Sequence, residues 1–396
     1  MIPPKKSKVR LFTPLKLRGV ETKNRIIVSP MCQYSADDGM ANDWHFVHLG
    51  RFALGGAGIV MVEATAVTKD GRITHGDMGL WSDAHIAPLA RIATFLRNHG
   101  AVPAIQLAHA GRKASMQRPW FGNGPLNADD FLRGETPWDV VAPSAIPLDE
   151  GWITPHALTQ DELAGLRDAY RAAVERAIKG GFDILEAHMA HGYLMHSFLS
   201  PISNKRDDKY GGERAGRMRF PLEIAETVRA AWPAEKPLFV RISSVDGLDG
   251  GWTIEDSVAF ARELRARGVD VIDCSSGGLT GSATAARIPR GYGFQLPFAA
   301  RIRSEAEIAT MTVGLIVHPQ QAEDALSEGA ADLIAIGREA LFDPNWPLHA
   351  EMALGAREGE IYASWPKQAG WWLERREPGL RKLEGPPLPF RTRANA

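Results

Sequence analysis

Short and almost continuously apolar runs recur along the chain, separated by longer amphipathic segments. Eight of these runs are rich in β-branched residues and lack the alternation of a half-exposed strand. This pattern is typical of parallel strands that are buried on both faces. The predicted strands are Arg25–Pro30, Ile59–Val67, Pro103–His109, Phe182–Met189, Leu238–Ser244, Val269–Ser275, Val313–His318 and Asp332–Gly337.

Helical patterns lie between the predicted strands. The clearest one starts at Thr159, which forms a capping-box pair with Glu162, and it ends at two glycines, Gly180 and Gly181. Another starts at Thr253 and ends at a glycine by the same chemistry. A strand followed by a helix, repeated eight times, predicts an α/β fold. We expect a single (β/α)8 TIM barrel over residues 1–360.

Two segments do not fit the eightfold pattern. Residues Met116–Val140 are rich in Gly, Pro, Asn and Trp and interrupt the connection after the third strand. They fall on the face where barrel active sites lie, so they either cover the site or form a surface excursion. Residues 361–396 carry Trp365, Trp371 and Trp372 and are too aromatic for a disordered end, so this tail is expected to dock on another surface.

Composition narrows the class of partner. The 396 residues are 44% hydrophobic and 23% charged, which is ordinary for a soluble globular protein. A net charge of −1 gives no field that would draw the chain to nucleic acid or to an anionic membrane, so a small-molecule partner is expected. No apolar run is long enough to cross a membrane and no secretory signal is evident, which predicts a cytoplasmic protein. Cys32 and Cys274 are too few for an iron–sulfur or zinc site.

The C-terminal ends of barrel strands are where such folds carry their chemistry, and here these ends hold polar or small residues. The candidates, in chain order, are Ser29–Tyr34, Glu63–Thr65, Gln106, His109–Lys113, His188, His191, Tyr193, Arg241, Cys274–Gly278, Gly314, Gly337 and Arg338.

A phosphate site is predicted at the last two strands. Gly314 and Gly337 can offer backbone N–H groups there, next to Arg338. The alternative is that the glycines only turn the chain and that Arg338 pairs with a carboxylate. Arg241, deep at the end of the fifth strand, needs an anionic partner, and Gln106 offers the donors and acceptor that suit a pyrimidine-like edge. Together these groups suggest flavin mononucleotide (FMN), and the usual dinucleotide and P-loop motifs are absent from the sequence.

Three histidines, His188, His191 and His196, lie within nine residues of one another. No HExxH motif is present, so no metal site is predicted. His188 and His191 stand at the end of a barrel strand with Tyr193 directly after them. Two neutral imidazoles can together hold a carbonyl or nitro oxygen and stabilise negative charge that develops on it. His196, among apolar neighbours, is interpreted as structural.

The sequence resembles the old yellow enzymes, which are flavin-dependent ene-reductases, from LFTPLKLRG to IGREAL. The resemblance rests on NRIIVSPMCQYSA, GRITHGDMGLWSD, QLAHAGRK, HMAHGYLMHSFLSPISNKRDDKYGG and DLIAIGRE. Cys32, Tyr34 and the two histidines look like the thermophilic-like bacterial branch, and the Trp-rich tail looks most like its xenobiotic reductases. The resemblance implies FMN contacts by Ser29, Pro30, Met31, Cys32, Ala64, Gln106, Arg241, Gly314, Gly337 and Arg338.

The resemblance also implies the roles of the remaining residues. Cys32 would tune the flavin potential, Tyr34 would join His188 and His191 at the substrate, and Tyr193 would be the proton donor. NADPH or NADH would reduce the flavin, after which an activated alkene, quinone or nitro compound would be reduced in ping-pong order. The implied assembly is a homodimer or a dimer of dimers, with the tail reaching a neighbouring subunit's active site.

Three other interpretations remain open from the residues. A dienoyl-CoA reductase or amine dehydrogenase uses the same flavin barrel, but it carries an iron–sulfur segment and further domains that this chain lacks. A flavin-free, phosphate-binding lyase or isomerase would be colourless. A non-catalytic flavin carrier would be coloured without turnover, and the paired histidines beside Tyr193 argue against it.

Overall fold

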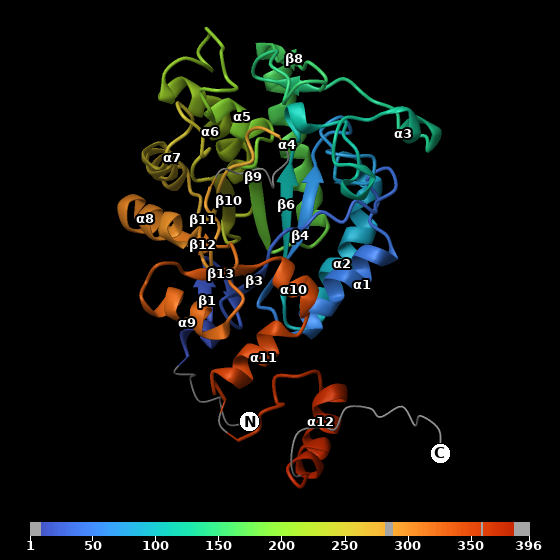
Figure 1. Cartoon of the computed structure of the whole chain (residues 1–396), viewed down its shortest axis with the longest axis vertical. Helices are drawn as coiled ribbons and strands as arrows, with labels where there is room; N and C mark the ends of the chain where they lie inside the picture. The colour runs from blue at the N-terminus through green and yellow to red at the C-terminus, as the bar shows by residue number, and fades with distance from the viewer. Residues whose placement is uncertain (1–8, 282–287, 358, 384–396) are drawn as a thin grey trace, which may run out of the picture.

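Eight parallel strands close into a barrel that is surrounded by helices (Figure 1). The computed structural model describes residues 9–281, 288–357 and 359–383. Each barrel strand pairs with its neighbours in chain order, and the first also pairs with the last, which closes the sheet. The barrel strands are β3 (Ile26–Val28), β4 (Ile59–Ala66), β6 (Val102–Ala108), β9 (Ile184–Met189), β10 (Leu238–Ser243), β11 (Val271–Ser275), β12 (Ala309–Thr312) and β13 (Leu333–Ile336). The predicted TIM barrel is confirmed.

Helices follow the strands as the prediction requires. Capping boxes at Thr159 and Thr253 begin α4 and α7, where each threonine hydroxyl accepts a backbone N–H three residues on. The outer helices are α1 (Asp43–Leu54), α2 (Ile86–Asn98), α4 (Gln160–Lys179), α6 (Arg214–Ala231), α7 (Ile254–Ala266), α8 (Leu296–Ala306), α9 (Pro319–Ser327), α10 (Arg338–Phe342) and α11 (Trp346–Ala353). The short α5 (Leu194–Leu199) follows β9 before α6.

The position predicted for the seventh strand was wrong. The apolar run Val313–His318 was chosen, whereas β12 ends at Thr312, just before that run. Gly314 has φ +118° and Leu315 has φ +52°, so the backbone leaves the extended region immediately after the strand. The other seven predicted strands overlap the observed ones. As a consequence, Gly314 lies beyond the C-terminal end of β12, on the face where ligands bind.

Smaller elements complete the fold. An N-terminal hairpin of β1 (Leu15–Leu17) and β2 (Val20–Thr22) pairs antiparallel, and β5 (Met78–Gly79) pairs in parallel with the last residues of β4. The two-residue strands β7 (Val141–Ala142) and β8 (His156–Ala157) pair near the C-terminal rim of the barrel.

The interior of the barrel is layered. Its lower part is wholly apolar and consists of Ile27, Ile59, Met61, Ala104, Ile184, Phe239, Val271, Met311, Leu333 and Ala335. Successive side chains of a strand point to opposite faces, so the next inward positions are two residues further along each strand. At that level four neighbouring strands carry polar residues, namely Gln106, Glu186, Arg241 and Asp273. The site is therefore built on a dry apolar floor.

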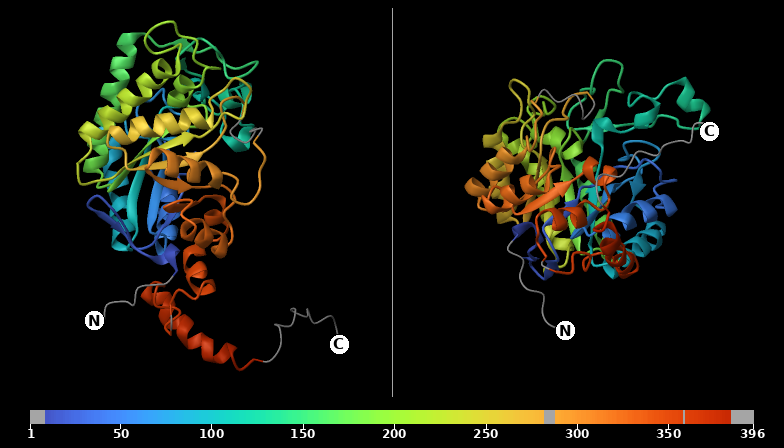
Figure 2. Two further views of the ribbon diagram at one scale, coloured as in Figure 1. Left: turned by 90° about the vertical axis from the view of Figure 1, so that its left-hand side faces the viewer. Right: turned by 60° about the horizontal axis from the view of Figure 1, so that its bottom comes forward.

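The two segments outside the pattern lie at opposite ends of the molecule (Figures 1 and 2). Residues Met116–Val140 form a short 3-10 turn and α3 (Ala128–Leu132) at the C-terminal rim of the barrel. The tail forms α12 (Lys367–Leu380), which lies beyond α11 at the other end. Only Gly370 of this helix is buried, and Trp371 and Trp372 are exposed.

Candidate active site

A buried polar layer forms the base of the candidate site. The Gln106 side-chain amide donates to Glu186 Oε1 at 2.7 Å. Arg241 Nε lies 3.1 Å from Asp273 Oδ2, an ion pair that lacks hydrogen-bond geometry. Glu186 Oε2, Arg241 Nε and both Asp273 oxygens have no hydrogen-bond partner among the described residues. Unpartnered buried groups of this kind are costly, which is typical of a surface that meets a polar ligand.

His188, His191 and Tyr193 come together at the end of β9. The His188 ring centroid lies 5.2 Å from that of His191 and 5.0 Å from that of Tyr193, and both contacts are edge-to-face. The backbone N–H of Ala190 donates to His188 Nδ1, so the proton of this ring is on Nε2. Burial, with the Arg241 guanidinium nearby, holds the pKa of both histidines well below the usual value. Each ring is therefore neutral and carries one N–H.

His191 is held in an uncommon backbone conformation, with φ +60°. Its backbone N–H donates to Ser243 Oγ at 2.9 Å, and its ring Nε2 lies 2.6 Å from Ser275 Oγ. Lys113 Nζ donates to its carbonyl oxygen at 2.8 Å. Ser243 and Ser275 are the last residues of β10 and β11, and Lys113 belongs to the 3-10 turn Gly111–Lys113 that follows β6, so three separate segments fix one histidine.

The contacts of His196 agree with its interpretation as a structural residue. The N–H of Gly192 donates to His196 Nδ1 at 2.8 Å, and His196 Nε2 donates to Asp246 Oδ1 at 2.8 Å. Both side chains of this pair are fully buried. Asp246 also accepts from Ser200 and from the backbone of Trp252. The pair thus anchors the turn that carries His191 and Tyr193.

Lys113 ends the motif QLAHAGRK, and the sequence alone predicts no role for it. It is fully buried, and its Nζ lies 5.6 Å from the centroid of the Tyr193 ring. Burial, with Arg112 beside it, lowers the pKa of Lys113 to about 7. The signal available in the sequence was a lysine shortly after a predicted barrel strand. A lysine that is buried at such a position needs a specific reason to be there.

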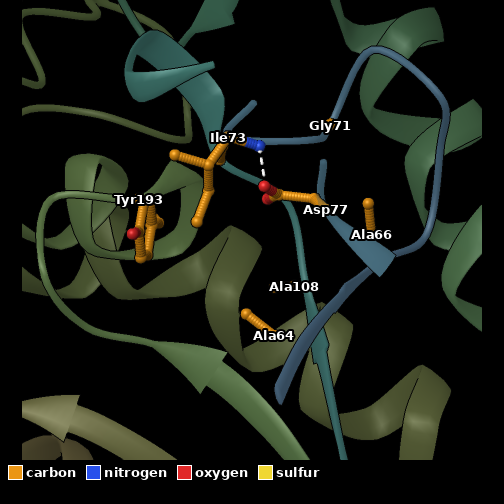
Figure 3. Close-up of a pocket in the computed structure, with 8 residues that line it drawn as sticks. Ala64, Ala66, Gly71, Ile73, Asp77, Ala108 and Tyr193 are labelled. Atoms are coloured by element: carbon orange, nitrogen blue, oxygen red, sulfur yellow. Dashed lines mark hydrogen bonds between the residues drawn. The ribbon is translucent and has the colours of Figure 1, made fainter. Parts of the chain in front are cut away.

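A small pocket lies beside Tyr193 (Figure 3). It is lined mainly by small residues at the ends of β4 and β6, and the full lining is Ala64, Ala66, Gly71, Ile73, Asp77, Ala108, Ala110 and Tyr193. Asp77 accepts from the backbone of Ile73 at 2.7 Å, as Figure 3 shows. Burial raises the pKa of Tyr193 well above its ordinary value, so its hydroxyl stays protonated.

Cys32 and Tyr34 belong to the same region. They pack with Tyr193 against an apolar cluster that includes Ile73 and Met116. Burial raises the pKa of Cys32 well above that of a free thiol, so the group is a thiol rather than a thiolate. The inserted segment Met116–Val140 reaches this point.

The inserted segment contacts Tyr34 directly. Trp120 packs edge-to-face on the Tyr34 ring with centroids 6.0 Å apart, and the Arg118 guanidinium donates to the Tyr34 carbonyl oxygen at 2.9 Å. Arg118 is itself held by Glu135 at 2.8 Å. These contacts argue against a surface excursion and favour the interpretation in which the insertion covers the site.

The ends of β3 and β13 lie side by side. Ser29 donates its backbone N–H to Ile336 at 2.9 Å, and a Cβ placed on Gly337 would come within 3.7 Å of Met31 Sδ. Arg338 follows directly and is exposed, and it has no carboxylate partner among the described residues. The described residues therefore give no support to the alternative in which Arg338 pairs with a carboxylate. Gly314 at the end of β12 completes this group of candidates.

Comparison with known proteins identifies the family. The sequence profile described as "NADH:flavin oxidoreductase / NADH oxidase family" matches residues 10–356. The chain belongs to this family. An NADPH dehydrogenase from Geobacillus sp. (strain WCH70) is 44% identical over 363 residues, which are 91% of this chain and 98% of the relative.

Solved structures agree with the assignment. An old yellow enzyme homologue from Zymomonas mobilis is 25% identical with a TM-score of 0.71, and the match covers 90% of this chain and 96% of that one. A 2-naphthoyl-CoA reductase is 25% identical with a TM-score of 0.77 over 89% of this chain, but the chain spans only 53% of that protein. The resemblance to the old yellow enzymes is thereby confirmed.

The protein is accordingly an FMN-dependent oxidoreductase that uses NAD(P)H as hydride donor. The residues present fit this cofactor, because Arg241 Nε and Ser29 Oγ are buried without hydrogen-bond partners, and within the described ranges no carboxylate pairs with the exposed Arg338. The flavin-free lyase or isomerase is thus set aside. No described helix is long and apolar enough to span a membrane, and the described ranges contain no cluster of three or more His, Cys, Asp or Glu side chains arranged for a metal ion.

Proposed function

We propose that the protein is an ene-reductase. It reduces the C=C bond of α,β-unsaturated carbonyl compounds and related electron-poor acceptors, such as quinones and nitro compounds. The observation that carries this proposal is the pair of neutral imidazoles beside a protonated Tyr193. NADPH is the proposed donor, since the curated relatives at 42–44% identity are named NADPH dehydrogenase.

The chain holds FMN through three groups of residues. Gln106 and Arg241 face the pyrimidine edge, because a side-chain amide and a guanidinium match its acceptors and its developing charge. Gly314, Gly337 and Arg338 bind the phosphate. Ser29, Pro30, Met31, Cys32 and Ala64 would contact the ring. When bound, FMN would supply the hydride-transfer chemistry between NADPH and the acceptor.

The protein's own groups then act on the acceptor. His188 and His191 donate hydrogen bonds to its carbonyl oxygen and stabilise the negative charge that develops there. Tyr193 gives its hydroxyl proton to the α-carbon, and hydride arrives at the β-carbon. Tyr34 bounds the acceptor on the side of the inserted segment, where Trp120 packs on its ring.

The assembly we propose is a homodimer or a dimer of dimers that acts in the cytoplasm. Trp371 and Trp372 are exposed on α12, which lies at the end of the molecule opposite the candidate site (Figure 2). Exposed tryptophans on one helix support a contact with a second copy of the chain. Which of Trp365, Trp371 and Trp372 makes that contact is tested by replacing each with alanine and measuring the oligomeric state.

Anaerobic stopped-flow absorbance tests the activity. The purified protein is mixed with NADPH and then with 2-cyclohexenone, and the saturated ketone is measured by gas chromatography. Bleaching of the flavin band, its recovery and formation of cyclohexanone are expected. A flavin that is bleached by NADPH but stays reduced with every activated alkene would contradict the proposal.

A further inference from the structure

The polar layer of the barrel brings one positive and two acidic groups together. The layer consists of Gln106 on β6, Glu186 on β9, Arg241 on β10 and Asp273 on β11, which are neighbouring strands. The exposed fractions of these side chains are 2%, 0%, 8% and 0%, in the same order. The apolar floor lies directly below them. Charge in this layer is therefore balanced either within it or by a ligand above it.

Strand register decides which groups pair. Arg241 and Asp273 are direct partners across β10 and β11, and Gln106 and Glu186 are direct partners across β6 and β9. Asp273 thus lies against the guanidinium at 3.1 Å, whereas Glu186 is bound by an uncharged amide. On the other side of Asp273, β12 contributes Met311 at the paired position, which carries no charge.

These contacts place the negative charge of the layer on Asp273. Burial and the nearby Asp273 raise the pKa of Glu186 well above its ordinary value, so Glu186 keeps its proton. Burial raises the pKa of Asp273 to about 6, against the opposing effect of Arg241. At neutral pH the layer then contains one guanidinium and one carboxylate, and its net charge is zero.

We propose that Asp273 is a positioning residue that sets the reduction potential of the flavin through Arg241. The inference rests on the proposed function for the placement of FMN against Arg241. Ionised Asp273 holds the guanidinium and offsets its positive charge, so that less of this charge stabilises the reduced, anionic flavin. Without the carboxylate, the full guanidinium charge acts on the ring.

A proton is linked to this effect. Reduction adds negative charge near Asp273, which raises the pKa of its carboxyl group further. Hydride supplies the two electrons and one proton to the flavin, and the additional proton on Asp273 comes from solvent. Reduction therefore takes up one extra proton in the pH range just above about 6. Each pH unit in that range changes the equilibrium by an additional factor of up to about ten.

The test is a redox titration of bound FMN against a reference dye between pH 5 and pH 8. Asp273→Asn keeps the shape of the side chain and removes its charge. At pH 7.5 we expect the ratio of reduced to oxidised flavin at a fixed dye potential to rise about tenfold, or about 30 mV for a two-electron couple. The extra pH dependence should disappear in this variant. Affinity of the apoprotein for FMN, measured by fluorescence, provides a readout that is independent of turnover.

Two further variants separate the causes. Glu186→Gln replaces a group that is already uncharged, so its potential should shift far less than that of Asp273→Asn. An equal shift in both variants would assign the charge to Glu186 and overturn the proposal. Arg241→Gln should lower the potential. If this variant lowers it and Asp273→Asn leaves it unchanged, only the role of Asp273 fails.

The placement of the flavin fails under a different result. If neither Arg241→Gln nor Asp273→Asn changes the potential or the affinity for FMN, the ring is not against Arg241. Should Asp273→Asn not fold, the wild-type titration still decides. A potential with no additional proton dependence between pH 6 and pH 8 overturns the role of Asp273.

Discussion

Replacing His191 with alanine removes one of the two N–H donors that the proposed mechanism directs at the acceptor oxygen. The ring is fixed by Ser275 Oγ at 2.6 Å, and its main chain is held by Ser243 and Lys113, so the donor is preorganised. Loss of one donor of this kind typically costs about 10²–10³ in rate, or about 3–4 kcal/mol. We expect flavin reoxidation by 2-cyclohexenone to slow by about a hundredfold.

Asparagine at the same position is the matched control. His191 has φ +60°, a conformation that asparagine adopts more readily than most residues, whereas alanine does so at a cost. Asparagine also offers an amide N–H in place of the imidazole N–H. His191→Asn should therefore fold like the wild type and recover part of the reoxidation rate that His191→Ala loses.

The assay is anaerobic stopped-flow absorbance, in which the two half-reactions are measured separately. Reduction by NADPH should stay within about threefold of the wild-type rate, because the His191 N–H that binds the acceptor oxygen is not used in that step. The reasoning is refuted if His191→Ala slows both half-reactions equally, or if reoxidation by the enone is unaffected while the variant remains folded.

Three other outcomes are expected. Tyr193→Phe should slow reduction of an alkene by at least about a hundredfold and reduction of a quinone much less, because only the alkene needs a proton on carbon; equal rates for the two acceptors would demote Tyr193 to a packing role. His196→Ala should lower the free energy of unfolding by about 3–5 kcal/mol in chemical denaturation, because it leaves Asp246 buried and charged. His349→Ala, which breaks the exposed pair with Asp343, should change that free energy little, and similar losses in both would contradict the argument. Burial raises the pKa of Glu63 to about 8. Between about pH 4.5 and pH 8 the native chain therefore keeps a proton that the unfolded chain has lost. The contribution of Glu63 to the free energy of unfolding then falls as the pH rises through this range. Glu63→Gln should lose this dependence, which amounts to at most about 1.4 kcal/mol per pH unit, and an unchanged pH profile of the melting temperature would show that Glu63 is not the group involved.

Much of this arrangement could be predicted from the sequence, because hydrophobic runs and helix caps are local features. The end of β9 was found in this way, and with it His188, His191 and Tyr193 as one group. The error at β12 has a local cause as well. The run after that strand is more apolar than the strand itself, and the positive φ values that end the strand are not visible in a hydrophobic pattern.

Other features depend on register and could not be predicted. The pairing of Arg241 with Asp273 follows from the alignment of β10 with β11, which no local pattern specifies. The same holds for Lys113, whose Nζ reaches the carbonyl oxygen of His191 in the turn after β9. A residue that ends a strand can be placed at the mouth of a barrel from sequence alone, but the neighbour that fixes its charge cannot.

The lining of the pocket beside Tyr193 allows the selectivity for acceptors to vary independently of the reaction. Ala64, Ala66, Ala108 and Ala110 are small, and none of their side chains carries a hydrogen-bonding group, so in the proposed function they act only through the volume they leave beside Tyr193. Larger residues at these positions would change which acceptor shapes fit and leave the imidazoles and Tyr193 in place. Selectivity can therefore diverge among variants of this barrel through volume alone, while the reaction that they perform is retained.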